Sequence, residues 1–341
     1  MNTTENSTSL TPTTSGSSDD APSMAWVNVC KIIMSIVGLT GNFLVCLVFI
    51  GVKRLRTTTN YFIVSLGVAD LISSFMIMPI PIPQQVSPGL QGELYCRVIF
   101  SGAFLWISFK ASVFNLVAVT IERYFAIVHS VKHKIFFTKR RCLYILAVVW
   151  LCAFILESLA FYIFLYDHSI KHCIIWWPND NYRLAVAALL FLASFLIPVV
   201  ILIIMYIRIL VFLKRHTQTM LSRNENNSPA FSLLKAREKI VKMLFLVVIT
   251  FTVCWAPNQT LFMALNYGAA LDLLAPYYQF FILLAFCNSC MNPIIYSFKN
   301  KQFRDGLKVI FCKQSMKVVP GSSDNNTQNL TVASNNADQN V

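Results

Sequence analysis

The chain has 341 residues and a formal net charge of +13, yet only 13% of its residues are charged and 56% are hydrophobic. So few charged side chains could not cover the surface of a water-soluble protein of this length. The apolar residues also gather in runs of about 20 residues, the length of a helix that crosses the hydrocarbon core of a bilayer. The composition therefore excludes a soluble protein and predicts one that spans a membrane.

The basic residues alternate with the apolar runs. Of the 28 Lys and Arg residues, 23 lie between the first and second runs, at and after the third, between the fifth and sixth with their ends, and after the seventh. This alternation is typical of a multi-pass membrane protein with basic cytoplasmic loops, and attraction to anionic membrane lipids is a secondary effect. We therefore expect an extracellular N-terminus, a cytoplasmic C-terminus and no nucleic-acid partner.

In chain order, residues 1–25 are rich in Ser and Thr, and we expect them to form a disordered extracellular tail. Asn2 and Asn6 lie in N-x-S/T sequons, so both are predicted to be glycosylated. Seven spans follow, at 27–51, 61–83, 98–122, 143–165, 184–208, 240–264 and 275–297. Most connections are short, so neighbouring helices are expected to be antiparallel, with a polar, basic loop near 209–239.

The segment after the seventh span predicts a short amphipathic helix in the inner interface, because Phe303 and Leu307 share one face. Cys312 at its end is a predicted palmitoylation site, with a free thiol as the alternative. Residues 314–341 are low in complexity and are expected to form a disordered cytoplasmic tail. The predicted domain, 26–313, is thus an all-α membrane protein, a seven-transmembrane helix bundle with an eighth helix at the inner interface.

Polar side chains inside the predicted spans are costly to bury in lipid, so each is a candidate functional residue. They are Asn42, Asp70, Ser112, Asn115, Asn288, Ser289 and Asn292. We expect six of the seven to line one polar core whose only acid is Asp70, because a buried carboxylate needs a cation, a proton or several hydrogen-bond donors. A network that only holds the helices together is the alternative.

Three prolines, Pro198, Pro257 and Pro293, lie inside predicted helices. Each removes a backbone hydrogen bond and favours a kink. Kinked helices can pivot, which suits a conformational switch, although static kinks are also frequent in membrane helices.

These features accompany a series of short motifs in a fixed order. They are GNFLV (41–45), SLGVAD (65–70), ERY (122–124), FTVCWAP (251–257), NPIIY (292–296) and FKNKQF (298–303), with Cys96, Ser112, Trp150, Cys173, and Pro198 followed by Tyr206. Over about residues 25–313 the chain resembles a rhodopsin-like (class A) G-protein-coupled receptor. Any one motif is weak evidence, whereas the whole set on the matching spans is specific.

The resemblance implies a role for each matching position. The implied sodium pocket comprises Asp70, Ser112, Asn288, Ser289 and Asn292; the toggle comprises Phe251, Trp255 and Pro257; and the G-protein switch comprises Glu122, Arg123, Tyr124, Tyr206 and Tyr296. Cys96 and Cys173 resemble the disulfide that joins the third helix to the second outer loop. The implied partners are a heterotrimeric G protein and arrestin at the plasma membrane, with an allosteric Na⁺ at Asp70 and no catalytic residue.

Two positions depart from the family pattern. Many relatives carry a second acid on the sixth helix, twenty residues before its proline, where this chain has Arg237; Glu238 follows, about 100° away around the helix. Glu122 is therefore expected to hold Arg123 alone, and we expect elevated basal activity. Cys96 lies 27 residues before Arg123, a longer spacing than is common in the family, so we expect a longer outer end or a bulge.

Single positions argue against two ligand classes. Light-sensing members use a lysine on the seventh helix, and the matching residue here is Phe286, with no lysine in 276–297. Amine receptors use an aspartate on the third helix, and the matching residue here is Leu105, with no acid between Glu93 and Glu122. A small cationic amine would therefore lack a counter-ion.

The segment around Cys173 favours a peptide ligand. It is long and carries apolar, aromatic and charged residues on both sides of the cysteine, which suits a β-hairpin lid anchored by Trp176 and Trp177. The segment resembles peptide-binding members, so we favour a neuropeptide-like extracellular ligand, with a lipid or another small molecule as the alternative. The two tryptophans are equally typical of an interfacial aromatic belt.

Lys110 and Glu157 are charged residues at mid-span. Lys110 lies thirteen residues before Arg123, about 20 Å along the helix, and Glu157 lies at a similar depth on the antiparallel fourth span. We predict that they pair or jointly line the cavity floor, because an unpaired lysine there would be strongly penalised. The predicted ligand cavity comprises Leu105, Lys110, Glu157, Trp176, Trp177 and Phe286.

Two other function classes find less support. A secondary transporter would show internal repeats or a continuous polar path, whereas the sequence has no evident repeat and one polar cluster. An intramembrane enzyme needs paired acids or a metal-binding set within the spans. The five histidines, His129, His133, His168, His172 and His216, lie in predicted loops or at their edges. The sequence therefore predicts a receptor that works by shifting conformational populations, not an enzyme.

Overall fold

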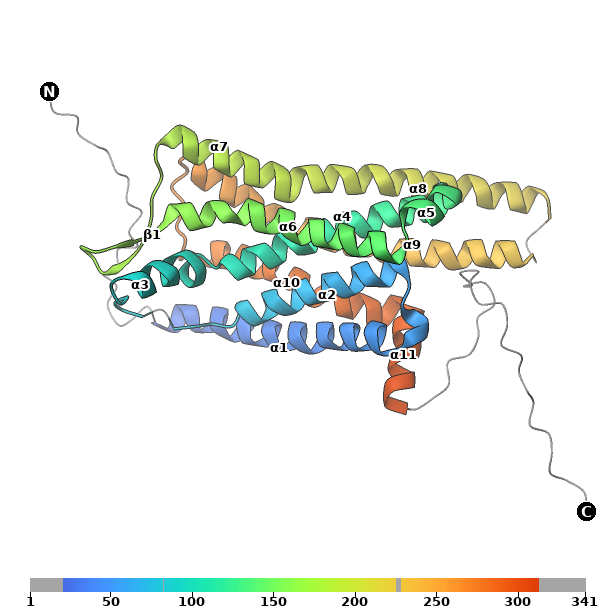
Figure 1. Ribbon diagram of the computed structural model, residues 1–341, viewed down its shortest axis with the longest axis horizontal. Helices are drawn as coiled ribbons and strands as arrows, with labels where there is room; N and C mark the ends of the chain where they lie inside the picture. Colours follow the sequence, from blue (N-terminus) through green and yellow to red (C-terminus); the bar gives the residue numbers. More distant parts are fainter. Residues whose placement is uncertain (1–20, 82, 225–227, 313–341) are drawn as a thin grey trace, which may run out of the picture.

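The fold is an elongated bundle of long helices whose axes run side by side (Figure 1). The structure, a computed structural model, describes residues 21–81, 83–224 and 228–312. Seven helices in these ranges are long and apolar enough to cross a membrane. The predicted sequons at Asn2 and Asn6 and the predicted tail 314–341 lie outside the described residues, so their assignments stay predictions.

The seven spans follow the predicted order. They are α1 (Ala21–Gly51), α2 (Thr58–Met76), α4 (Ala103–Val128) preceded by α3 (Leu90–Leu94) and the π-helical η2 (Tyr95–Phe100), α6 (Lys139–Ile163), α7 (Asp180–Phe191) continued through the π-helical η3 (Leu192–Leu196) into α8 (Ile197–Ser222), α9 (Pro229–Asn266) and α10 (Pro276–Lys299). Shorter elements are the 3-10 helix η1 (Lys53–Leu55), α5 (Ser130–Phe136), α11 (Lys301–Cys312), and the strands β1 (Phe164–Asp167) and β2 (His172–Ile175).

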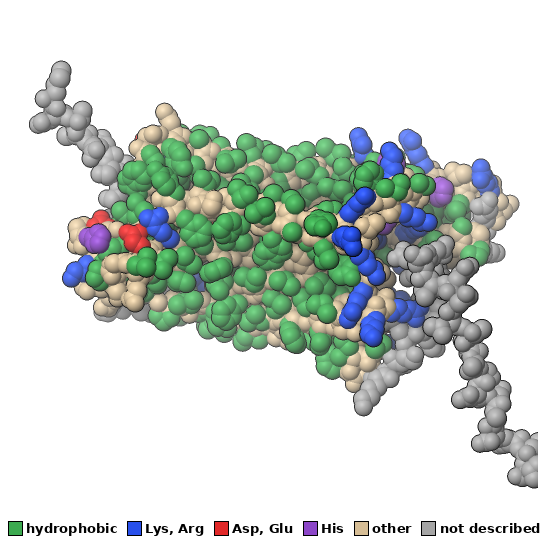
Figure 2. Space-filling model, viewed as in Figure 1, with side chains coloured by type: hydrophobic (Ala, Val, Ile, Leu, Met, Phe, Trp, Pro, Cys, Tyr) green, Lys and Arg blue, Asp and Glu red, His purple; other side chains and the backbone are tan. Residues whose placement is uncertain are grey.

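We name the two ends of the bundle by the elements that mark them. The hairpin end carries β1 and β2, and the α11 end carries α11, which runs across the bundle (Figure 1). Figure 2 shows hydrophobic side chains over the middle of the visible face and a band of Lys and Arg side chains towards the α11 end. Exposed basic residues near that end include Lys53, Arg56, Lys132, Lys139 and Arg140.

Several predicted boundaries are wrong. α1 begins at Ala21, inside the predicted N-terminal tail. α2 ends at Met76 instead of 83, because Pro79 and Pro81 follow and the residue before a proline disfavours helical backbone. The predicted loop 209–239 is largely helical, since no glycine or proline lies between residue 209 and Ser222. α8 and α9 consequently extend beyond the other spans (Figure 1).

The third span contains the bulge that the spacing between Cys96 and Arg123 predicts. The π-turns of η2 take more residues per turn than an α-helix. Gly102 then turns the chain with a left-handed φ of 67°, which glycine adopts without strain, and α4 starts at the next residue. Together these features absorb the additional residues.

The hairpin is fixed to this bulge by the disulfide that the family resemblance implies. Cys96 in η2 is bonded to Cys173 in β2, and both residues are buried. β1 and β2 pair antiparallel, with Tyr166 opposite Cys173. The Tyr166 hydroxyl donates a hydrogen bond to the carbonyl oxygen of Val86 at 3.2 Å. These contacts hold the hairpin over one end of the bundle.

Candidate functional site

The buried carboxylate of Asp70 lies at the centre of a polar cluster, as the sequence predicts. Asn292 donates to one carboxylate oxygen at 2.7 Å and Ser112 donates to the other at 3.1 Å. The Ser289 hydroxyl lies 2.9 Å from that of Ser73, and the Asn42 amide donates to the Ser289 carbonyl at 2.9 Å. The cluster therefore joins α1, α2, α4 and α10.

Two predicted members behave differently. Asn115 donates to the carbonyl of Ala111 on its own helix at 2.9 Å, and Asn288 is buried on α10 without a described bond to Asp70. Ser73, one turn after Asp70, also belongs to the cluster; the sequence does not single it out, because a serine in a span gives a weaker signal than an acid or an amide. The side-chain oxygens of Asn42 and Asn115 are buried without a hydrogen-bond partner in the described residues.

A layer of aromatic side chains lies on the hairpin side of this cluster and centres on the buried Trp255. Its ring lies 6.5 Å from that of Phe251 and 5.0 Å, edge to face, from that of Phe109. Phe109 in turn stacks on Phe286 at 5.8 Å. Pro257 follows Trp255 by two residues within α9, so the indole sits at the point where that helix lacks a backbone hydrogen bond.

At the α11 end, Arg123 is held by its sequence neighbour Glu122. The Arg123 Nε and Nη2 atoms lie 2.6 and 2.8 Å from the two Glu122 oxygens, and Arg123 also contacts the Thr59 hydroxyl. Glu122 is fully buried and accepts further hydrogen bonds from Thr58 and Thr59, while His133 Nε2 lies 2.8 Å from its Oε1 atom. The carboxylate is therefore surrounded by α2, α4 and α5.

The departure at Arg237 and Glu238 concerns α9, which carries both residues. Glu238 pairs with Lys235 and Lys242 on its own helix, at 3.4 and 2.7 Å, and not with Arg123. Among the described residues, the carboxylate that pairs with Arg123 is Glu122.

Tyr206 and Tyr296, the two tyrosines assigned to the switch, are both fully buried. Tyr124 instead lies at the surface side of α4 and its hydroxyl is 3.3 Å from His129. Tyr206 and Tyr296 thus lie in the core, whereas Tyr124 lies near the end of α4, beside His129.

A cavity of about 320 Å³ lies towards the hairpin end, between α4, α6, α7 and α9. Its polar lining residues are Ser101, Lys110, Glu157, Arg183, Ser194, Asn258, Gln259 and Asn266. Its aromatic lining residues are Trp106, Phe109, Phe164, Trp177, Trp255 and Phe262. The cavity is therefore largely apolar with a few polar groups, which is typical of a ligand site.

Three predicted cavity residues line it and three do not. Lys110, Glu157 and Trp177 are lining residues. Phe286 is not, because its ring stacks on Phe109 below the cavity. Leu105 packs against the hydrophobic core. Trp176 points outward, with 41% of its surface exposed and its ring 6.0 Å from that of Tyr162. α1, α2 and α10 supply no lining residue.

Lys110 and Glu157 form the ion pair that their depth predicts. The Lys110 Nζ atom contacts Glu157 Oε2, and only 9% and 7% of the two side chains is exposed. The same Nζ atom lies 5.8 Å from the centre of the Trp106 ring, within the range of a cation–π interaction. The pair joins α4 to α6 at the cavity wall.

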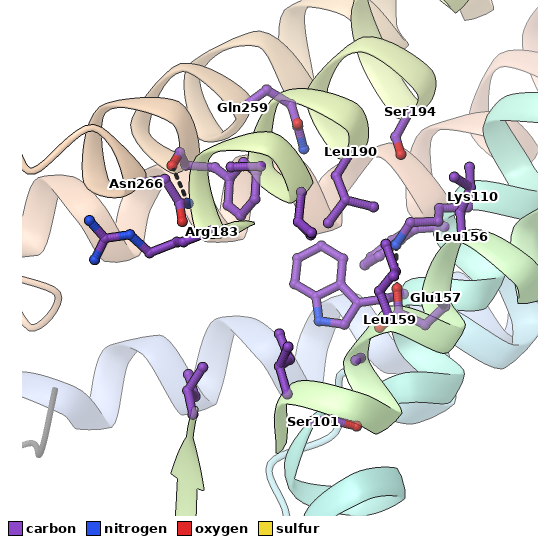
Figure 3. A pocket seen from close by; sticks show the side chains of 18 of the residues that line it. Ser101, Lys110, Leu156, Glu157, Leu159, Arg183, Leu190, Ser194, Gln259 and Asn266 are labelled. Atoms are coloured by element: carbon purple, nitrogen blue, oxygen red, sulfur yellow. Dashed lines mark hydrogen bonds and ion pairs between the residues drawn. The ribbon is translucent and has the colours of Figure 1, made fainter. Parts of the chain in front are cut away.

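The other end of the cavity carries polar residues that the sequence did not single out. Figure 3 shows Arg183 and Asn266 at one end and Lys110 with Glu157 at the other. Arg183 Nη2 pairs with the exposed Asp180 at 3.2 Å, and its buried Nε has no partner in the described residues. An arginine close to an acid at the start of a helix is typical of a solvent-exposed surface. The sequence therefore gives no sign that Arg183 lines the cavity, and only the structure shows it.

Comparison with known proteins finds one matching family model and several similar receptors. The family model of the seven-transmembrane receptors of the rhodopsin family matches residues 41–296. The chain is 31% identical over 302 residues to neuropeptide FF receptor 2 of Rattus norvegicus, covering 82% of this chain and 71% of that protein. It is 30% identical over 285 residues to galanin receptor 2a of Danio rerio, covering 81% and 75%. It is 28% identical over 294 residues to the allatostatin-A receptor of Bombyx mori, covering 82% and 78%.

Exchanging the charges of Lys110 and Glu157 tests the ion pair. Lys110→Glu or Glu157→Lys alone places two like charges together in the wall, so each should destabilise the protein by about 3–5 kcal/mol and lower its amount at the cell surface. The double exchange should restore most of the loss, measured by surface labelling and thermal unfolding. A double variant no better than the singles would contradict the pairing.

The exposed pair Lys235–Glu238 provides a matched control. About half of the Lys235 side chain is exposed, so exchanging these two charges should change the free energy of unfolding by less than about 1 kcal/mol.

Proposed function

The chain belongs to the rhodopsin family of seven-transmembrane, G-protein-coupled receptors, and on this premise we propose that it binds an extracellular peptide at the hairpin end and activates a heterotrimeric G protein at the α11 end. It is a multi-pass membrane protein and a signalling receptor, not an enzyme. The observation that carries the peptide proposal is the cavity under the hairpin, with polar groups at both of its ends.

The geometry of the cavity supports an elongated ligand. Arg183 at the mouth and Ser194 deeper in the same wall are eleven residues apart, about 16 Å along the helix. About five extended peptide residues cover that distance. Relatives named as receptors for neuropeptide FF, galanin and allatostatin-A point in the same direction. A small apolar molecule is the second candidate, because a largely apolar cavity of about 320 Å³ is of suitable size for one.

The proposed orientation places the hairpin end outside the cell and the α11 end in the cytoplasm of the plasma membrane. The band of Lys and Arg near the α11 end supports it (Figure 2), because basic residues concentrate on the cytoplasmic side. The disulfide at the hairpin end agrees with an oxidising exterior. In this orientation α11 lies in the inner interface beside anionic lipids, with exposed Cys312 available for palmitoylation.

The proposed mechanism links the cavity to Arg123 through α9. A ligand that contacts Trp255 would bias the bend of α9 at Pro257. Movement of α9 would uncover Arg123 and let it exchange Glu122 for contacts with the G protein, and arrestin would engage the same opened surface. Tyr206 and Tyr296, buried between the cavity and Arg123, would reorient in the same step. The ligand supplies the free energy by binding the bent state more tightly.

A peptide-library assay tests this proposal. The purified receptor in lipid discs, incubated with a G protein and a library of short peptides, should catalyse nucleotide exchange in a peptide-dependent manner. A parallel library of lipids and small apolar molecules should give no comparable response. Exchange that responds only to the second library would replace the peptide with the alternative ligand. Solute flux in liposomes without any exchange would contradict a receptor.

The residue at position 237 should set the basal activity. Arg237→Glu would offer Arg123 a second acid across the bundle, so it should lower ligand-free nucleotide exchange by about two- to fivefold, the effect of one ion pair of up to about 1 kcal/mol. Arg237→Gln, which removes the positive charge without adding an acid, is the matched control and should stay near wild type. Equal basal exchange in Arg237→Glu and wild type would contradict the prediction.

We also propose that Na⁺ binds beside Asp70. The carboxylate and the Ser112 and Ser289 hydroxyls are oxygen ligands of the kind that hard cations prefer. Sodium chloride should therefore raise the unfolding temperature of the wild type above its value in N-methylglucamine chloride at equal ionic strength. Asp70→Asn should abolish the difference. A sodium effect that persists in Asp70→Asn would place the ion elsewhere.

A further inference from the structure

The surroundings of the Lys110 ammonium group are those of a bound organic cation. Its Nζ atom meets the carboxylate of Glu157 and lies 5.8 Å from the centre of the Trp106 ring. An acid together with an aromatic face is the combination with which proteins receive a ligand's ammonium group. Here the ammonium group belongs to the receptor itself.

This cation site faces the ligand cavity. Trp106, Lys110 and Glu157 all line it, and Glu157 is the single acid among the described lining residues. Both charged side chains are more than nine-tenths buried. A buried carboxylate needs a cation, a proton or several hydrogen-bond donors, and Lys110 supplies the cation to Glu157 before any ligand arrives.

We propose that the deep end of the cavity is a cation-binding site that the receptor keeps occupied with its own Lys110. The site is formed by the Glu157 carboxylate and the Trp106 ring, and its specificity is for a primary alkylammonium group. Removal of the lysine side chain beyond Cβ would turn the occupied site into a receptor site for a small alkylamine.

The occupied site also limits which chemical group a ligand can place at the deep end of the cavity, and this consequence rests on the proposed function. A ligand cation at this depth would have to displace Lys110 or lie beside its like charge, so the deep group of the ligand is not a cation. Ser194 Oγ and Trp255 Nε1 are buried in the cavity wall with no hydrogen-bond partner in the described residues. Each of these groups can donate a hydrogen bond, so the deep group of the ligand carries an acceptor such as a carbonyl oxygen.

Chemical rescue tests the site without a known ligand. Lys110→Ala removes three carbons and the ammonium group, which together have the composition of n-propylammonium. The variant should unfold at a lower temperature than the wild type, and n-propylammonium chloride should raise that temperature in a saturable manner, by roughly 3 °C once its concentration is ten times its Kd. The wild type, whose site is filled, should not respond.

Two controls separate charge recognition from filling of space. n-Propanol has nearly the same size without the charge and should not stabilise Lys110→Ala. Combining Lys110→Ala with Glu157→Gln should abolish the response to n-propylammonium, whereas combining it with Glu238→Gln should keep it. Glu238 is the matched control because it pairs with lysines on the surface of α9, away from the cavity.

A poorly folding variant leaves the proposal testable. If Lys110→Ala fails to reach the cell surface, n-propylammonium in the culture medium should restore its surface expression and n-propanol should not. Equal rescue by both compounds, rescue that survives Glu157→Gln, or no rescue by either readout would overturn the proposal.

The same variant tests the consequence for the ligand. Peptides with an amine at their deep end should gain affinity for Lys110→Ala by tenfold or more relative to the wild type. Because the rescue measurement needs neither a peptide nor a G protein, its result is independent of the proposed function. Rescue by n-propylammonium without peptide-driven exchange would refute the proposed function alone, and exchange without rescue would refute the occupied cation site alone.

Discussion

A charged group buried in a membrane-embedded bundle costs several kcal/mol of free energy unless a partner pairs with it. The three acids buried inside the described part of this bundle each have such partners. Glu122 binds Arg123 at one level and Glu157 binds Lys110 at another, while Asp70 between them is met by hydrogen-bond donors. The Lys110–Glu157 pair joins α4 to α6, the donors to Asp70 join α2 to α4 and α10, and the contacts of Glu122 with Thr59 and His133 join α4 to α2 and α5. The same contacts that solve the energetic problem therefore also fix which helices lie together.

This arrangement explains why the cavity lies on one side of the bundle. Lys110 and Glu157 hold α4 against α6 at the cavity floor, while Phe286 stacks on Phe109 and closes the space towards α10. The cavity is left between α4, α6, α7 and α9, under a hairpin tied down by a disulfide. A ligand in this position would contact α9, which, like α10, has an internal proline.

The sequence predicts most of what depends on local pattern and depth. Hydropathy and charge locate seven helices in order. The rise per residue of an α-helix is enough to predict that Lys110 and Glu157 lie at the same depth. The helix ends depend on proline context, as at Met76, or on the absence of any breaker, as before Ser222. Contacts between distant segments were inaccessible: nothing in the sequence marks Thr58, Thr59 or His133 as neighbours of Glu122. The direction of a single side chain is equally inaccessible, so the sequence predicts Leu105, Trp176 and Phe286 in a cavity that none of them lines.

The distribution of unsatisfied polar groups suggests where the bundle can change most easily. At the α11 end, the Glu122 carboxylate has several partners, so an alternative arrangement there must replace many contacts at once. In the middle of the bundle, Trp255 Nε1 and the Tyr296 hydroxyl are buried without a hydrogen-bond partner in the described residues. Rearranging these groups sacrifices no hydrogen bond and allows a new one to form. The layer around Pro257 and Pro293 is therefore a part of the fold where a change in helix packing sacrifices few side-chain hydrogen bonds.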